Sequence, residues 1–300
     1  MNAIEIRNLT KNFGEKQALN GLNMTVPQGA IYGFIGENGS GKSTTEKIVC
    51  GLVLPSGGDI KLFGKDYKDP DVRAKVGVLI ESPGCFPNYS VWNNMMLQAA
   101  NLGIKNAKEE VRKVLRIVHM DGSASNKYKN CSLGMKQRIG IAFALLGSPT
   151  LLILDEPING LDADGMRIMR EVLVDITKNY NCTVVISSHI LSELEKIATH
   201  YGIVRNGKMI AEMTAKELNT NCPTFVALKV KDMSAAKVML ERKYTRVERD
   251  EEDYIRIYDA VKAEEVADYL YNEHKIVVTE IKTSKIGLEE YYIDLMKEGR

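Results

Sequence analysis

Paired cysteines are absent from this sequence. Its five cysteines, at positions 50, 85, 131, 182 and 222, are odd in number and widely separated, and no two of them form a CxxC pair. A disulfide framework or a cysteine-ligated zinc site is therefore not expected, and buried thiols in a reducing compartment explain the cysteines better.

Long apolar runs are also missing. No stretch approaches the roughly eighteen consecutive apolar residues of a membrane-spanning helix. The N-terminal residues MNAIEIRNLT do not have the pattern of a signal peptide. We therefore expect a cytosolic chain, and if it works at a membrane the spanning segments must belong to another polypeptide.

An excess of charge of one sign is the third feature that the sequence lacks. It has 40 Lys and Arg against 39 Asp and Glu, which gives a formal net charge of +1, and the basic residues form no stripe. A protein that binds nucleic acid through its phosphates usually has a basic excess, so we expect no nucleic-acid partner.

The pattern of short strand-like and longer helix-like runs indicates an α/β fold with a large and a small domain. The predicted large domain covers residues 1–218 and carries a helical insertion at about 84–149, bounded by Pro83 and Pro149. A polar linker near 218–225 is predicted to lead into a C-terminal domain, 219–300. Its elements follow the order βαββαβ, as in the ferredoxin-like split-βαβ unit.

The strongest local motif is GENGSGKST, which follows the strand-like run AIYGFI and opens a helix. Glycines let the backbone wrap around phosphate oxygens, and the helix directs its positive end at the same anion. In such a loop Lys42 reaches the β- and γ-phosphates and Ser43 ligates Mg²⁺. The predicted nucleotide-binding residues of the loop are Gly36, Asn38, Gly39, Ser40, Gly41, Lys42, Ser43 and Thr44.

A second apolar run, TLLILDEP, ends in two carboxylates. Next to a phosphate loop, Asp155 is expected to hold Mg²⁺, and Glu156 to orient and deprotonate the attacking water. Acidic residues at a strand end are common in turns, but the phosphate loop makes the catalytic interpretation the stronger one. The sequence therefore predicts ATP and Mg²⁺ as ligands.

With these motifs in order, residues 1 to about 218 resemble the ATP-binding subunits of ABC transporters. The segment CSLGMKQR resembles the signature of that family, usually LSGGQ: Ser132 and Gly134 match it, whereas Cys131, Leu133 and Met135 depart from it. The resemblance implies a P-loop ATPase fold, with Ser132, Gly134 and Met135 closing the nucleotide site of a second subunit.

Three further positions fit the resemblance. Asp162 ends INGLD, which resembles the loop that crosses the dimer seam, and His189 ends TVVISSH at the place of the switch histidine. Phe13 stands where the family stacks an aromatic ring on adenine. The resemblance implies two subunits meeting head to tail, and since every catalytic element is present we expect a homodimer, with a heterodimer left open.

Glu81, in VGVLIESPGCF, stands where most of these ATPases have a glutamine that contacts Mg²⁺ and the attacking water. This variant loop is similar to that of the lantibiotic-immunity and bacitracin-resistance ATPases. The resemblance implies export of a peptide antibiotic through a separate integral-membrane permease, with this subunit at the cytoplasmic face. Phe86, Tyr89 and Trp92 either line the permease-docking groove or pack within the insertion.

Two alternative functions, and the role of the C-terminal domain, remain open at this point. A transporter of another substrate, including an importer, has the same motifs, although importers more often carry an all-β C-terminal module. A soluble ABC-type ATPase acting on ribosomes or DNA fits less well, because this chain has one cassette and a short insertion. The C-terminal domain contacts the other subunit or a regulator, or only covers its own sheet.

Overall fold

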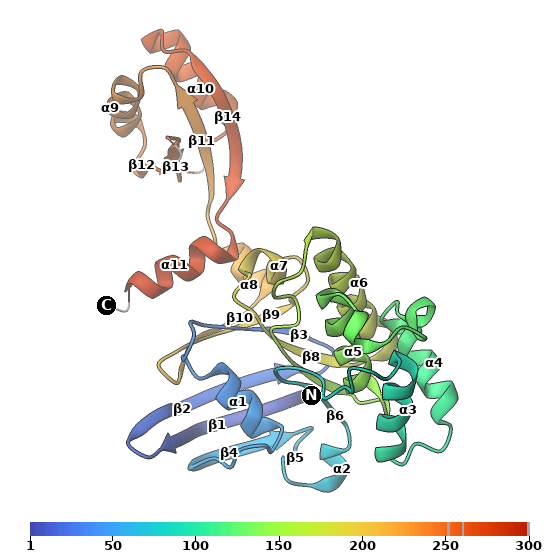
Figure 1. Ribbon diagram of the computed structural model, residues 1–300. Coiled ribbons are helices and arrows are strands. Elements are labelled where there is room, and N and C mark those ends of the chain that lie inside the picture. The colour runs from blue at the N-terminus through green and yellow to red at the C-terminus, as the bar shows by residue number, and fades with distance from the viewer. Residues whose placement is uncertain (251–252, 260, 299–300) are drawn as a thin grey trace. The chain divides into compact units, whose positions relative to one another are not determined.

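The computed structural model describes residues 1–250, 253–259 and 261–298 (Figure 1). The chain divides into two compact units, Met1–Ala215 and Lys216–Arg300. The division therefore lies at residue 215, slightly before the predicted boundary at 218. Among the described residues, every helix is too short or too polar to cross a membrane.

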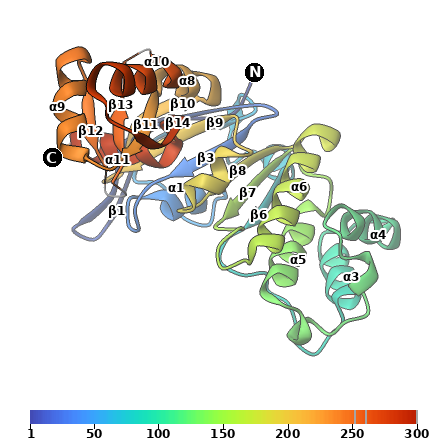
Figure 2. The same ribbon diagram turned by 90° about the horizontal axis from the view of Figure 1, so that it is seen from above.

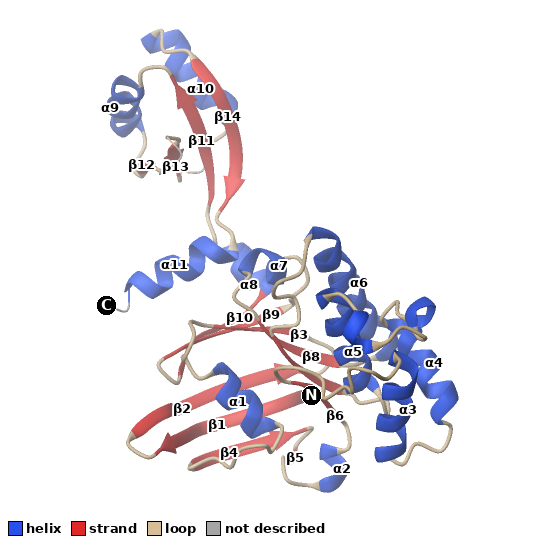
Figure 3. Cartoon of the chain, in the orientation of Figure 1, coloured by secondary structure: helices blue, strands red, loops and turns tan. Residues whose placement is uncertain are grey.

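The first unit contains two sheets (Figure 3). The antiparallel sheet has the strand order β2-β1-β4-β5, and the larger sheet has the order β10-β9-β3-β8-β7-β6. The first is built from β1 (Asn2–Phe13), β2 (Lys16–Pro27), β4 (Gly57–Leu62) and β5 (Lys65–Asp66). The second is built from β3 (Ile31–Ile35), β6 (Val76–Leu79), β7 (Leu151–Asp155), β8 (Thr183–Ser187), β9 (His200–Arg205) and β10 (Lys208–Thr214).

The larger sheet is parallel from β9 to β6, and only β10 runs antiparallel, at the edge. All five residues of β3 and of β8 are buried, as expected for parallel strands that are covered on both faces. Because parallel strands end at the same edge of a sheet, the loops that follow β3, β7 and β8 meet there. Ligands of open α/β sheets bind at this edge.

Helix α1 (Lys42–Val49) lies between the two sheets (Figure 1). Its buried Ile48 and Val49 belong to one apolar cluster with residues of both sheets, among them Ile6 from β1, Ile60 from β4 and Ile153 from β7. This shared core fixes the helix, and with it the loop that precedes it, against the end of β7.

The predicted helical insertion is present, and Figure 2 shows α3 and α4 beyond the β6 edge of the sheet. It contains α3 (Val91–Asn101), α4 (Ala107–Ile117), two 3₁₀ turns (Asp121–Ser123 and Tyr128–Asn130) and α5 (Leu133–Leu145). Buried Asn94 joins α3 to its preceding loop, because its amide accepts from the backbone of Phe86 and donates to the carbonyls of Phe86 and Ser90. The remaining helices of this unit are α2 (Pro70–Arg73), α6 (Ala163–Tyr180) and α7 (Leu191–Glu195).

Two parts of the observed fold differ from the predicted elements. The hairpin of β9 and β10, joined at Asn206 and Gly207 with φ of 50° and 72°, is absent from the predicted set. The linker predicted at 218–225 is wrong in part, because α8 (Ala215–Asn221) and β11 (Thr224–Val230) occupy most of it. Helix formers such as Ala215, Glu217 and Leu218 outweigh the proline signal there.

The C-terminal unit has one antiparallel sheet with the order β12-β13-β11-β14. Along the chain β11 is followed by α9 (Met233–Lys243), β12 (Val247–Arg249), β13 (Ile255–Ile257), α10 (Ala263–Asp268) with a π-helical turn (Tyr269–Glu273), β14 (Val278–Lys285) and α11 (Leu288–Glu298). Residues such as Leu228, Leu240, Ile255 and Leu270 form a core of its own.

Gly77 provides a test of how α5 packs on the sheet. A Cβ atom at this position would lie 2.0 Å from the carbonyl oxygen of Ala144 in α5. We expect Gly77→Ala to lower the free energy of unfolding by about 2 kcal/mol, because the helix must move away from β6. Urea denaturation measures this. Gly122→Ala, where a Cβ atom would meet nothing within 4 Å, is the control and should change stability little; equal losses in both variants would contradict the close packing.

Candidate functional site

The loop between β3 and α1 has the backbone of a phosphate-binding loop. A Cβ atom at Gly36 would lie 2.4 Å from the carbonyl oxygen of Val204, and Gly41 has a φ of 114°, so both positions require glycine. Gly41 is the N-cap of α1 and no side chain caps the helix. The first amides of α1 therefore remain available for an anion.

Lys42 lies at the centre of the site and is 7% exposed. Its Nζ donates to the carbonyl oxygens of Gly36 at 2.6 Å and Glu37 at 3.1 Å, so the lysine holds the loop in a closed turn. Burial lowers the pKa of Lys42, whereas the charges of Glu156, Glu46 and Asp155 raise it. A cation surrounded by carboxylates is thus placed under the loop.

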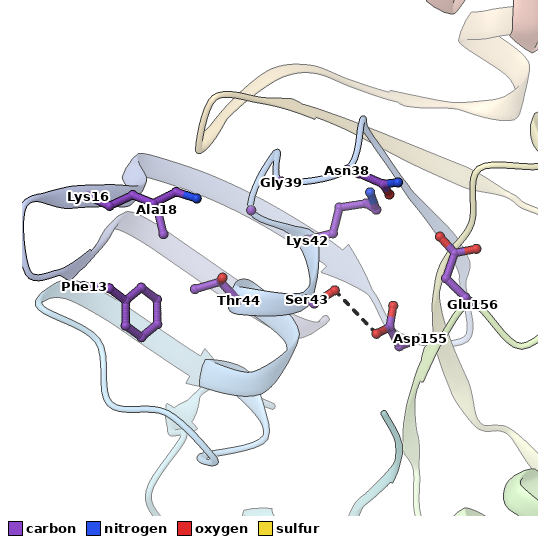
Figure 4. A pocket seen from close by; sticks show the side chains of 11 residues that line it. Phe13, Lys16, Ala18, Asn38, Gly39, Lys42, Ser43, Thr44, Asp155 and Glu156 are labelled. Atoms are coloured by element: carbon purple, nitrogen blue, oxygen red, sulfur yellow. Dashed lines mark hydrogen bonds between the residues drawn. The ribbon is translucent and has the colours of Figure 1, made fainter. Parts of the chain in front are cut away.

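A pocket of about 470 Å³ opens beside this loop (Figure 4). This volume lies in the usual range of small-molecule sites. Phe13 lies at one end of the pocket and the two carboxylates at the other, with Lys42 and Ser43 between them. The pocket is lined by Phe13, Lys16, Ala18, Asn38, Gly39, Gly41, Lys42, Ser43, Thr44, Asp155 and Glu156. Of the predicted loop residues, Gly36 and buried Ser40 support the turn without lining the pocket.

Asp155 ends β7 and faces the start of α1. The hydroxyl of Ser43 donates to Asp155 Oδ2 at 3.4 Å, and the hydroxyl of Ser187 donates to Asp155 Oδ1 at 2.6 Å. Ser187 also accepts the backbone N–H of Glu156 at 3.1 Å. One serine at the end of β8 therefore orients both carboxylate-bearing residues.

Glu156 and His189, the predicted catalytic base and switch histidine, lie next to each other. His189 Nδ1 is 2.9 Å from Glu156 Oε2. Glu156 has a φ of 50°, an uncommon conformation for a residue other than glycine, and such strain is often found at functional sites. Its side chain is partly exposed toward the pocket.

Glu81, in contrast, is not brought to the pocket. It follows β6 with a φ of 66° and its side chain is 74% exposed. Its carboxylate pairs with Lys47 on α1, with Oε1 3.0 Å from Nζ. The side chain that was predicted to bind the metal therefore joins the loop after β6 to α1.

The signature residues and the INGLD loop lie beside each other, outside the pocket lining. Ser132 is the N-cap of α5 and accepts the N–H of Met135 at 3.3 Å. A Cβ atom at Gly134 would lie 3.5 Å from Cδ2 of Leu161, in the loop that ends at Asp162. Asp162 in turn caps α6 by accepting the N–H of Gly165 at 2.8 Å.

Sequence reasoning missed four residues of the site: Lys16 and Ala18 in the lining, Ser187, and the buried Glu46. The signal for Ser187 was its place at the end of a strand next to the one that carries Asp155. Glu46 lies three residues after Ser43, hence on the same face of α1. Lys16 and Ala18 follow Phe13 across a turn and have no local signal.

A phosphate loop on a parallel sheet, a lysine under it and a carboxylate pair at the next strand end define a P-loop ATPase. The sequence model of the ABC transporter family matches residues 19–159. The chain is 36% identical over 302 residues to the bacitracin transport ATP-binding protein BcrA of Bacillus licheniformis, covering 99% of this chain and 98% of that protein. It belongs to the ATP-binding proteins of ABC transporters.

Two further similarities agree with this assignment. The lantibiotic transport ATP-binding protein SrtF of Streptococcus pyogenes is 42% identical over 209 residues, 70% of this chain and 90% of that protein. The structure of cbiO1 from Clostridium perfringens, part of the ABC transporter complex cbiONQ, superposes with a TM-score of 0.67 and 26% identity, covering 73% of this chain and 91% of that one. The predicted ABC ATPase fold and the predicted branch are confirmed.

Ser187→Ala tests whether one hydroxyl positions both carboxylates. The variant loses the donor to Asp155 and the acceptor for Glu156 N–H, so ATP turnover should fall about tenfold or more, as is usual for residues that orient ligands. Phosphate release measures turnover. Ser188→Ala removes an equally buried hydroxyl that accepts only the N–H of Ile190 in its own turn, and should retain most turnover. Wild-type turnover in Ser187→Ala would contradict the positioning role.

Proposed function

We propose that this chain is the ATP-hydrolysing subunit of an ABC exporter that moves a peptide antibiotic of the bacitracin or lantibiotic type away from the membrane for self-protection. The single observation that carries the ATPase is the phosphate loop with Lys42 under it and Asp155 and Glu156 opposite. The cargo is supported by the likeness to BcrA, which extends over 99% of this chain and thus includes the C-terminal unit.

The donor set at the pocket fits Mg²⁺. Hydroxyl and carboxylate oxygens are the ligands that this cation prefers, and the Ser43 and Asp155 oxygens already lie 3.4 Å apart. Glu46 lies buried nearby, and burial together with the charge of Asp155 raises its pKa well above the usual range. Ser43 and Asp155 would hold the ion, which when bound neutralises charge on the β- and γ-phosphates.

The remaining site residues have distinct roles in this proposal. Phe13, half-exposed at the end of the pocket, offers a ring face to adenine, and the amides of residues 39–44 bind the phosphates. Glu156 orients and deprotonates the attacking water, and His189 holds the carboxylate in place while its ring contacts the γ-phosphate. When the nucleotide binds, the Nζ of Lys42 would donate to phosphate oxygens in place of the carbonyl oxygens of the loop.

Two copies of the chain would complete the site. Ser132, Gly134 and Met135 lie at the start of α5 and do not line the pocket of their own chain, so we assign them to the nucleotide of another subunit. Asp162 holds the adjacent loop at the same surface. A homodimer with two ATP sites is therefore the proposed assembly.

The other partner would be an integral-membrane permease on separate chains, with this subunit at the cytoplasmic face of the membrane. Phe86 and Tyr89 are 52% and 51% exposed, with ring centroids 5.3 Å apart, and they lie in the loop between β6 and α3 that also contains Glu81. Trp92 instead lies partly buried with the Arg112 guanidinium 5.8 Å from its ring. Phe86 and Tyr89 are thus the better candidates for the docking groove.

Glu156→Gln tests the proposed ATPase. The amide keeps the size of the side chain but cannot accept a proton, so phosphate release should fall at least about a hundredfold while ATP stays bound. We expect turnover to stop while ATP stays bound in a dimer. A phosphate assay measures the turnover, and gel filtration detects the dimer. Lys42→Ala, the control, should lose nucleotide binding itself. Normal turnover in Glu156→Gln would contradict its role as the base.

Glu81→Gln tests whether this residue couples ATP use to transport. The change removes the ion pair with Lys47 that joins the start of the insertion to α1. We expect hydrolysis to persist and transport to weaken, measured as bacitracin or lantibiotic sensitivity of cells that also express the permease. Lys47→Gln breaks the same pair from the other side and should act alike. Full resistance in both variants would show that Glu81 merely replaces glutamine.

A further inference from the structure

Glu193, on α7, is a buried carboxylate that the proposed reaction does not use. It forms ion pairs with Arg170 of α6 and with Lys196, whose Nζ lies 2.6 Å from Glu193 Oε1. Burial raises the pKa of Glu193, but the hydrogen bonds from Lys196 and Arg170 outweigh it, so the pKa lies below its usual value. Glu193 is therefore a paired charge, and its pair with Arg170 joins two helices that are separate in the sequence.

Helix α7 depends on contacts with the rest of the fold. It has five residues, and a helix of this length is not stable on its own. The fully buried Leu194 packs toward β3, where a Cβ atom at Gly33 would lie 3.4 Å from its Cδ1. An apolar contact of this kind is not directional, so it does not fix the rotation of the helix about its axis. The charged hydrogen bond from Arg170 to Glu193 adds a directional contact.

His189 comes directly before the N-cap of α7, which is Ile190. The backbone N–H groups of Glu193 and Leu194 both donate to the carbonyl oxygen of Ile190, at 3.2 and 3.3 Å. The side chain of His189 is 55% exposed, and its Nδ1 lies 2.9 Å from Glu156 Oε2. Because so much of this ring faces outward, its position depends on the backbone that α7 anchors.

We propose that Glu193 and Arg170 are positioning residues for ATP hydrolysis, because their ion pair holds α7 and thereby keeps the ring of His189 in contact with Glu156. This inference rests on the proposed function, in which Glu156 is the base and His189 contacts the γ-phosphate. It adds to that function the support behind the histidine. Neither Glu193 nor Arg170 lines the pocket, so both act through His189 and not on the nucleotide.

Reaction rates are sensitive to small displacements of the reacting groups. A misplacement of about 1 Å, caused by a change far from the chemistry, can lower turnover by about a hundredfold. Loss of the ion pair would free α7 and leave Lys42 and the phosphate loop intact. ADP lacks the γ-phosphate that His189 contacts in the proposed reaction, so its affinity should not change. Turnover and the Kd of ADP together therefore separate a positioning role from a general loss of structure.

The first test measures phosphate release from γ-labelled ATP, and the Kd of ADP by calorimetry, in variants of the full chain. We expect Glu193→Gln and Arg170→Gln each to lower turnover about tenfold and to leave the Kd of ADP unchanged. Lys196→Gln is the matched control. Lys196 pairs with the same carboxylate but lies at the end of α7 itself, so it ties α7 to no other helix and the variant should keep most of the turnover.

The second test is a double-mutant cycle with His189→Ala, measured as residual phosphate release. If the pair acts through His189, Glu193→Gln should lower the residual turnover of His189→Ala by less than about twofold. The inference would be overturned by an equal fold loss in both backgrounds, by wild-type turnover in Glu193→Gln and Arg170→Gln, or by a matching loss of ADP affinity. A native chain that binds ADP but hydrolyses no ATP would overturn the proposed ATPase instead, so the two failures are distinguishable.

Discussion

The register between β7 and β8 is the constraint on which the site depends. It pairs Asp155 with Ser187 across the sheet, so that one serine hydroxyl donates to Asp155 and accepts from the backbone of Glu156. A shift of one residue would turn Ser187 to the other face of the sheet and leave both carboxylates without this support. The apolar runs of both strands, buried on both faces, hold this register in place.

The same edge of the sheet concentrates opposite charges in a small volume. Lys42 lies near Glu46, Asp155 and Glu156, and burial lowers the pKa of Lys42 and raises the pKa of Glu46. The Nζ of Lys42 donates to the carbonyl oxygens of Gly36 and Glu37 in its own loop. In the proposed complex, a polyphosphate would give the lysine a partner, and its cation would give the carboxylates a positive charge.

Site residues could be predicted from the sequence where a short motif identified them. The glycines of GENGSGKST predicted a tight loop, and the folded loop needs glycine at Gly41, where φ is 114°. The carboxylates of LLILDEP were equally predictable, because they lie at the end of a buried strand. The Asn206–Gly207 turn was an equally local hairpin signal that the prediction left unused. Ser187 and Glu46 carry weaker signals, because their contacts depend on neighbours on other strands and helices. Glu81 shows the same limit, since its position after β6 was predictable and its pairing with Lys47 was not.

The contacts at the start of α5 support the proposal that a second subunit completes the nucleotide site. The hydroxyl of Ser132 caps α5, and Leu161 packs against Gly134. The signature segment and the loop ending at Asp162 therefore form one packed surface. None of them lines the pocket formed by the phosphate loop of the same chain. A Cβ atom at Gly134 would lie 3.5 Å from Leu161, and this packed surface is the one that we propose to meet the nucleotide of another chain. In the proposed homodimer, the helical insertion of each chain would therefore contribute to the nucleotide site of the other chain.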